Sequence, residues 1–143
     1  MQQYIEFLQA NPLLAIAWIG VFIALIFTSV KAGLSTIKKV THQQATLLMN
    51  RESAKVIDVR SESEFKKGHI LDSTLLPLSK LKNNEFGGLE KELDAPIIVV
   101  CNTGMTSTQA CQMLQKAGFT NIHNLQGGIA EWKTANLPLT QKK

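Results

Sequence analysis

The sequence has 143 residues, enough for one globular domain with a single core, and gives no reason to expect two. Its 15 Lys and Arg residues exceed the 11 Asp and Glu residues only slightly. The sequence also has no segment in which basic and aromatic residues alternate, so no nucleic-acid partner is expected. Two cysteines are too few for a secreted disulfide framework, and the three histidines lack metal-ligand spacing, so no metal and no cofactor is expected.

An uncharged apolar segment runs from Leu13 to Val30 near the start of the chain. As a helix, a segment of this length spans about 27 Å, close to the roughly 30 Å hydrocarbon core of a bilayer. It lacks the preceding basic residues of a cleaved signal peptide. Lys31, Lys38 and Lys39 follow it, so the positive-inside rule places the later chain in the cytoplasm.

These features predict a single-pass anchor in residues 1–31 that contacts membrane lipid through residues 13–30. The expected location is the inner membrane, with the N-terminus outside and a domain of residues 40–143 in the cytoplasm. Residues 32–39 are interpreted as a juxtamembrane tether, since they contain few apolar side chains.

Helix and strand signals alternate after the tether. Thr41 and Gln44 form a capping box for a first helix, Lys55 to Val59 has the β-branched composition of a buried strand, and Ser61 with Glu64 caps a helix that ends at Gly68. A loop-rich stretch follows, and then a short helix over residues 88–94.

The strongest strand signal lies at Pro96 to Val100. A helical pattern begins at Thr106 and ends before Gly118, and the remaining elements are a strand over residues 121–125 and a helix over residues 127–135. Alternating strands and helices predict an α/β fold, with a small parallel sheet covered by helices on both faces and preceded by one transmembrane helix.

Cys101 ends the central strand, where ligands bind in open parallel sheets. The turn that follows contains Gly104, and its backbone N–H groups, with those of the next helix, can form an anion-binding nest that lowers the pKa of a cysteine. The local pattern also fits a buried thiol at the end of a strand, because free cysteine is often buried.

Three further segments resemble the rhodanese, or sulfurtransferase, homology domain. These are VIDVRSESEFKKGHI (Val56 to Ile70), CNTGMTS (Cys101 to Ser107), and GGIAEW (Gly127 to Trp132) followed by Leu137 and Pro138. The resemblance covers Val40 to Leu139. It implies that Cys101 accepts sulfane sulfur from a small donor, carries it as a persulfide, and passes it to a thiol or cyanide-like acceptor.

The resemblance also assigns the residues around Cys101. The backbone cradle for the persulfide is expected from Asn102, Thr103, Gly104, Met105 and Thr106, with hydroxyl groups from Thr106 and Ser107. Similar phosphatases have a longer loop closed by an arginine, whereas that position here is Ser107, which argues against phosphatase activity. The neutral loop also argues against thiosulfate as the donor and looks more like the branch that uses mercaptopyruvate.

Four other polar or sulfur-containing side chains have mainly structural interpretations. Asp58 and Arg60 are expected to pair and order the backbone near the site. His69 is expected to stabilise a turn rather than act as a base, and Cys111 is expected to be buried beside an apolar helix stripe.

Two functions therefore remain open. The first is a membrane-anchored sulfurtransferase with its site on Cys101. The second is a membrane-tethered docking module for a membrane protein or a small protein, in which catalysis is weak or dispensable; an apolar surface patch near the anchor would favour it.

Overall fold

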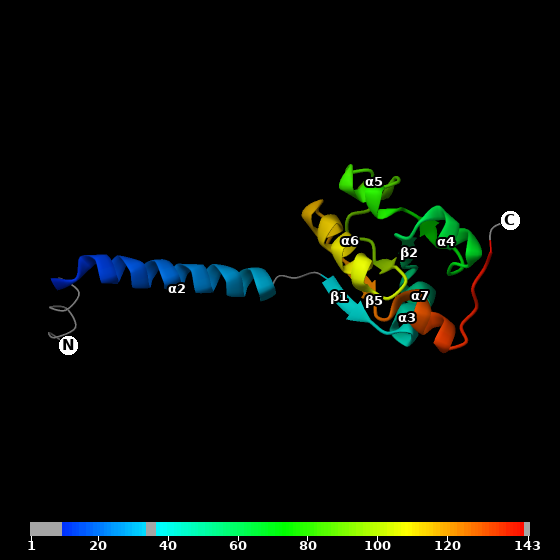
Figure 1. Cartoon of the computed structure of the whole chain (residues 1–143), viewed down its shortest axis with the longest axis horizontal. Coiled ribbons are helices and arrows are strands. Elements are labelled where there is room, and N and C mark those ends of the chain that lie inside the picture. The colour runs from blue at the N-terminus through cyan, green and yellow to red at the C-terminus, as the bar shows by residue number, and fades with distance from the viewer. Residues whose placement is uncertain (1–9, 34–36, 142–143) are drawn as a thin grey trace. The chain divides into compact units, whose positions relative to one another are not determined.

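The computed structural model describes residues 10–33 and 37–141, and the chain divides into two compact units, residues 1–35 and residues 36–143 (Figure 1). Each unit is described by itself below.

The described part of the first unit contains the helix α2 (Pro12–Gly33). Proline suits its first position, because the first N–H groups of a helix have no partner within the helix. Apolar side chains such as Leu13, Trp18 and Phe22 are 83 %, 75 % and 64 % exposed. Within residues 10–33 and 37–141, no helix combines the length and hydropathy needed for a membrane span. The predicted span is thus not confirmed, and the side chains of its last residues, 27–30, lie outside the described part.

The second unit is built on a parallel five-stranded sheet with the order β1-β5-β4-β2-β3. The strands are β1 (Ile37–Val40), β2 (Lys55–Asp58), β3 (Thr74–Leu75), β4 (Ile97–Val100) and β5 (Ile122–Leu125). All four residues of β4 are buried, as expected for a central strand covered on both faces.

Helices cover both faces of this sheet, as the sequence predicts. Alternating side chains of the strands divide the core into two clusters. Val56, Ile98 and Val100 face the cluster with α3 (His42–Glu52) and α7 (Gly128–Thr134). Ile57 and Val99 face the cluster with α5 (Leu78–Lys82), the 3-10 helix η1 (Leu89–Lys91) and α6 (Met105–Lys116).

The two predicted capping boxes are confirmed. Thr41 and Gln44 form a complete capping box on α3, and Ser61 and Glu64 form another on α4 (Glu62–Lys67), which ends at Gly68. At the end of α6, Phe119 N–H donates to the Leu114 carbonyl across Gly118, whose φ is +101°. This is the expected αL termination of a helix.

The structure differs from the predicted elements in three places. Residues 37–39 of the predicted tether belong to β1, an edge strand in which lysines face solvent and protect the open edge. The loop-rich stretch contains β3 and α5, which are too short to give a periodic pattern. The predicted helix over residues 88–94 is only the three-residue η1.

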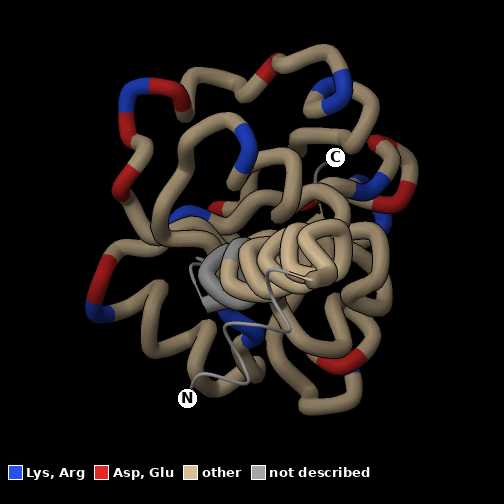
Figure 2. The backbone as a smooth tube through the Cα atoms, turned by 90° about the vertical axis from the view of Figure 1, so that its left-hand side faces the viewer, with Lys and Arg blue, Asp and Glu red and all other residues tan. Residues whose placement is uncertain are grey.

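Figure 2 shows lysine, arginine, aspartate and glutamate dispersed around the backbone of the second unit, rather than gathered into one face of a single sign. This distribution agrees with the small charge excess of the sequence.

Candidate active site

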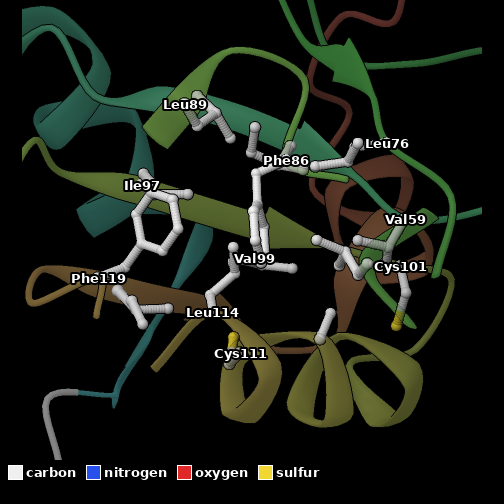
Figure 3. Close-up of a cluster of buried hydrophobic side chains, with 14 residues drawn as sticks. Val59, Leu76, Phe86, Leu89, Ile97, Val99, Cys101, Cys111, Leu114 and Phe119 are labelled. Atoms are coloured by element: carbon white, nitrogen blue, oxygen red, sulfur yellow. The ribbon is translucent and has the colours of Figure 1, made fainter. Parts of the chain in front are cut away.

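Cys101 lies at the carboxyl end of β4, where the chain turns into the loop that precedes α6. The residue is only 2 % exposed and belongs to the core cluster on the α6 face. In Figure 3 it lies at one end of that cluster, beside Val59, while Cys111 on α6 lies further inside. Both expectations for Cys101 are thus partly met: it is buried, and it lies at the sheet edge where ligands bind.

The loop places hydrogen-bonding groups around the sulfur of Cys101. The N–H of Gly104 donates to Sγ at 3.0 Å, and the thiol of Cys101 donates to Oγ of Ser107 at 3.4 Å. Gly104 has a φ of +93°, a conformation that glycine adopts without strain, and this geometry aims its N–H back at the cysteine.

These contacts lower the pKa of the Cys101 thiol. Burial raises it, but the hydrogen bonds that the ionised sulfur can accept outweigh burial: one from the Ser107 hydroxyl once its proton turns toward the sulfur, and those from the N–H groups of Ser107, Thr103 and Gly104. A lowered pKa increases the fraction of thiolate, which is the nucleophilic form of cysteine. The loop therefore favours a reactive sulfur.

A second layer of hydrogen bonds fixes Ser107, and sequence analysis did not identify its central residue, Asn124. Ser107 Oγ donates to Asn124 Oδ1 at 2.6 Å. The Asn124 amide nitrogen donates to Thr108 Oγ1 at 2.9 Å and to the Gly104 carbonyl at 3.3 Å. The available signal was a polar residue inside the buried strand β5, since buried amides need partners.

The first turn of α7 holds the loop from behind. Ile129 N–H donates to the Cys101 carbonyl at 2.9 Å, and Ala130 N–H donates to the Asn102 carbonyl at 3.0 Å. This approach requires Gly128, because a Cβ on that residue would lie 2.2 Å from the Cys101 carbonyl oxygen. The predicted GGIAEW segment therefore supports the site through its backbone.

Glu64 of α4 contacts the other side of the loop. Its Oε1 accepts a hydrogen bond from the Asn102 amide at 2.5 Å. Hydrogen bonds from Ser61 and Asn102 lower the pKa of Glu64 to about 2. Sequence analysis identified Glu64 only as a helix cap, because its partner is far away in the chain.

Cys101 and Glu64 share one pocket of about 290 Å³. It is lined by Val59, Arg60, Ser61, Glu64, Cys101, Asn102, Thr103 and Thr106. Of the predicted cradle residues, Asn102, Thr103 and Thr106 therefore line the pocket, while Gly104 and Ser107 contact the sulfur directly. Met105 does not line it, and its side chain is 81 % exposed.

Asp58 and Arg60 form a buried pair beside the pocket. The guanidinium contacts both carboxylate oxygens, with Nη2 at 2.6 Å from Oδ2 and Nε at 2.9 Å from Oδ1, and Nη2 also donates to the Gly68 carbonyl at 2.7 Å. A charged pair of this kind orders the chain between β2 and α4.

Within the described part of the chain, neither His69 nor Cys111 forms a hydrogen bond with Cys101. His69 Nδ1 lies 2.8 Å from the Phe65 carbonyl, and its ring stacks on Phe65 with centroids 3.7 Å apart. Cys111 is fully buried, and burial, followed by the charge of Cys101, raises its pKa to about 12.

Comparison with known proteins agrees with this geometry. The family model of the rhodanese-like domain matches residues 41–135. The chain belongs to the rhodanese-like domain family. The rhodanese-like domain thus includes the sheet from β2 to β5, the Cys101 loop and all of α7.

Three known proteins illustrate what this rhodanese-like domain is similar to. An uncharacterized protein of Escherichia coli, YibN, is 41 % identical over 143 residues, covering 100 % of both chains. The thiosulfate sulfurtransferase GlpE of Pseudoalteromonas translucida is 32 % identical over 98 residues, covering 68 % of this chain and 90 % of GlpE. The structure of a human single-domain sulfurtransferase is 25 % identical with a TM-score of 0.59, covering 67 % of this chain and 95 % of that one.

Proposed function

We propose that this protein is a sulfurtransferase that carries sulfane sulfur as a persulfide on Cys101. The observation that carries the proposal is the contact of Sγ with the Gly104 N–H at 3.0 Å, inside a loop that also lowers the pKa of the thiol. The similarity to named sulfurtransferases supports the same activity.

The reaction takes place in two displacements at sulfur. In the first, the Cys101 thiolate attacks the sulfane sulfur of a small donor; a new S–S bond forms, and the old bond to that sulfur breaks with its electron pair leaving on the donor remnant. In the second, an acceptor thiolate or cyanide attacks the terminal sulfur, and the Cys101 thiolate leaves. The backbone N–H groups of the cradle stabilise the anionic sulfur between the two steps.

The experiment is to incubate the full-length protein, in detergent where needed, with thiosulfate, mercaptopyruvate or cysteamine persulfide and to measure its intact mass. We expect a gain of one sulfur atom, which cyanide removes. Cys101→Ser abolishes the gain and lowers transfer by at least about a thousandfold, because the nucleophile is absent.

Cys111→Ala is the matched control and keeps the gain, because Cys111 is fully buried with a raised pKa. If none of these donors loads the wild-type protein while Cys101→Ser leaves its cellular role intact, the sulfurtransferase proposal is wrong. The docking module with a membrane-protein or small-protein partner then takes its place.

We further propose that residues 13–30 attach the domain to the inner membrane with the domain in the cytoplasm. The uncharged run and the lysines that follow it, Lys31, Lys38 and Lys39, support this orientation. The test is membrane fractionation with a carbonate wash, followed by protease treatment of spheroplasts. Full-length protein that washes off, or a domain that external protease digests, contradicts it.

A further inference from the structure

The charges around the Cys101 pocket define which sulfur donors can approach it. Glu64 lines the pocket and contributes a carboxylate whose hydrogen bonds with Ser61 and Asn102 keep it ionised near neutral pH. An anionic donor that enters the pocket therefore meets a negative charge as well as the thiolate that it must react with.

No unpaired cation compensates for Glu64 at this pocket. Among the residues of the described chain that line it, Arg60 is the one cation, and its guanidinium is 5 % exposed and bound to both oxygens of Asp58 and to the Gly68 carbonyl. The positive charge of Arg60 is thus matched by Asp58, and the Glu64 carboxylate is left as the net charge of the lining.

From this balance of charges, and resting on the proposed function, we infer that Glu64 is a specificity-determining residue. Its charge directs Cys101 toward organic persulfides with an uncharged or cationic leaving thiol. It acts against dianionic donors such as thiosulfate. In the favoured reaction, the Cys101 thiolate attacks the terminal sulfur of R–S–SH. A bond forms between Sγ of Cys101 and the terminal sulfur, the S–S bond of the donor breaks, and its electron pair leaves on R–S⁻, so that Cys101 carries the –SH as a persulfide.

Alkylation tests this inference without any sulfur transfer. Iodoacetate and iodoacetamide are similar in size and reactive group, but only iodoacetate is anionic, so the ratio of their rates at Cys101 reports the local charge. The Glu64→Gln variant removes the charge and keeps one acceptor oxygen, which can serve the Ser61 N–H of the helix cap in place of Oε2. It is expected to raise the iodoacetate to iodoacetamide ratio by about threefold to tenfold, the effect of one nearby charge.

Two matched variants separate charge from position. Glu62→Gln removes a carboxylate from the same helix that does not line this pocket, and it is expected to leave the ratio unchanged. Asn102→Ala breaks the hydrogen bond to Glu64 but keeps its charge, so both probes change rate by the same factor and the ratio stays low.

Donor loading by intact mass completes the test. Glu64→Gln is expected to raise the rate of loading from thiosulfate by about tenfold or more, because thiosulfate carries two charges, and to leave loading from cysteamine persulfide within about twofold. An unchanged alkylation ratio in Glu64→Gln overturns the inference. A raised ratio with no loading by any donor instead overturns the proposed sulfurtransferase and leaves the charge effect of Glu64 standing.

Discussion

Ser107 has one hydroxyl proton and two neighbours that compete for it. Asn124 Oδ1 accepts that proton at 2.6 Å, while the Asn124 amide nitrogen donates to Thr108 and Gly104, which fixes the orientation of the side chain. The Cys101 thiol can then donate to Ser107 at 3.4 Å. After ionisation, the hydroxyl of Ser107 can stabilise the thiolate only by turning its proton away from Asn124.

Asn124→Leu is therefore expected to lower the pKa of Cys101 further, by about one unit, because the Ser107 proton becomes free for the thiolate. Ser107→Ala is expected to raise it, because that donor is lost. The pH dependence of iodoacetamide alkylation measures both: the rate rises with pH as thiolate forms, so a lower pKa moves the midpoint to lower pH.

The double variant decides between this exchange and a general disturbance of the loop. When the Ser107 hydroxyl is absent, Asn124→Leu frees no proton for the thiolate. The pKa of Cys101 in the double variant is therefore expected to equal that in Ser107→Ala. A midpoint that moves to higher pH in Asn124→Leu alone contradicts the exchange.

At the scale of residues, the sequence was sufficient to predict the part of the site whose members are neighbours along the chain. Cys101, the glycine turn and the following helix form a local pattern, and their meeting depends only on a strand followed by a helix. Glu64 and Asn124 could not be placed, because each meets the loop across a distance in sequence that the order of the strands determines.

Among the elements, the seven-residue helix α7 holds the Cys101 loop in place. Its first N–H groups donate to the carbonyls of Cys101 and Asn102, so the backbone of the loop lies directly on the helix end. Gly128 has a φ of +57°, and a Cβ added to it would overlap the Cys101 carbonyl and the Asn102 backbone.

Gly128→Ala is expected to destabilise the protein by about 2–4 kcal/mol and to displace the Cys101 loop. Gly88→Ala is the matched control: its φ is +89°, but nothing lies within 4 Å of the added Cβ, so it costs only the backbone strain of about 1–2 kcal/mol. Urea unfolding measures the free energies, and alkylation of Cys101 reports the loop. Equal costs in the two variants would show that the overlap relaxes freely.

Elements with strong local signals were predictable, and weak ones were not. The two capping boxes and the apolar run of β4 place α3, α4 and β4 correctly. The edge strand β1 has two lysines in four residues and is a strand because β5 pairs with it, which its own composition does not indicate.

For the molecule as a whole, β1 marks where the folded domain begins. Val40 is 6 % exposed in the core, and all four residues of β1 pair with β5. The buried residues of both core clusters lie between Val40 and Trp132, inside the compact unit that starts at residue 36.

A fragment of residues 36–143 is therefore expected to unfold with a Tm within about 2 °C of the full chain. A fragment of residues 41–143 also lacks β1 and Val40, and its free energy of unfolding is expected to fall by about 2–4 kcal/mol. Calorimetry and urea unfolding of the two fragments measure this difference, and equal stability would mean that β1 contributes nothing to the domain.

The burial of Cys111 has a consequence for oxidative damage. The chain has only one other cysteine, and the raised pKa and full burial of Cys111 keep it a thiol that does not attack an oxidised neighbour. A sulfenic acid formed on Cys101 therefore cannot be converted into an internal disulfide without unfolding around α6. Recovery depends on an outside thiol that arrives before further oxidation to the irreversible sulfinic acid.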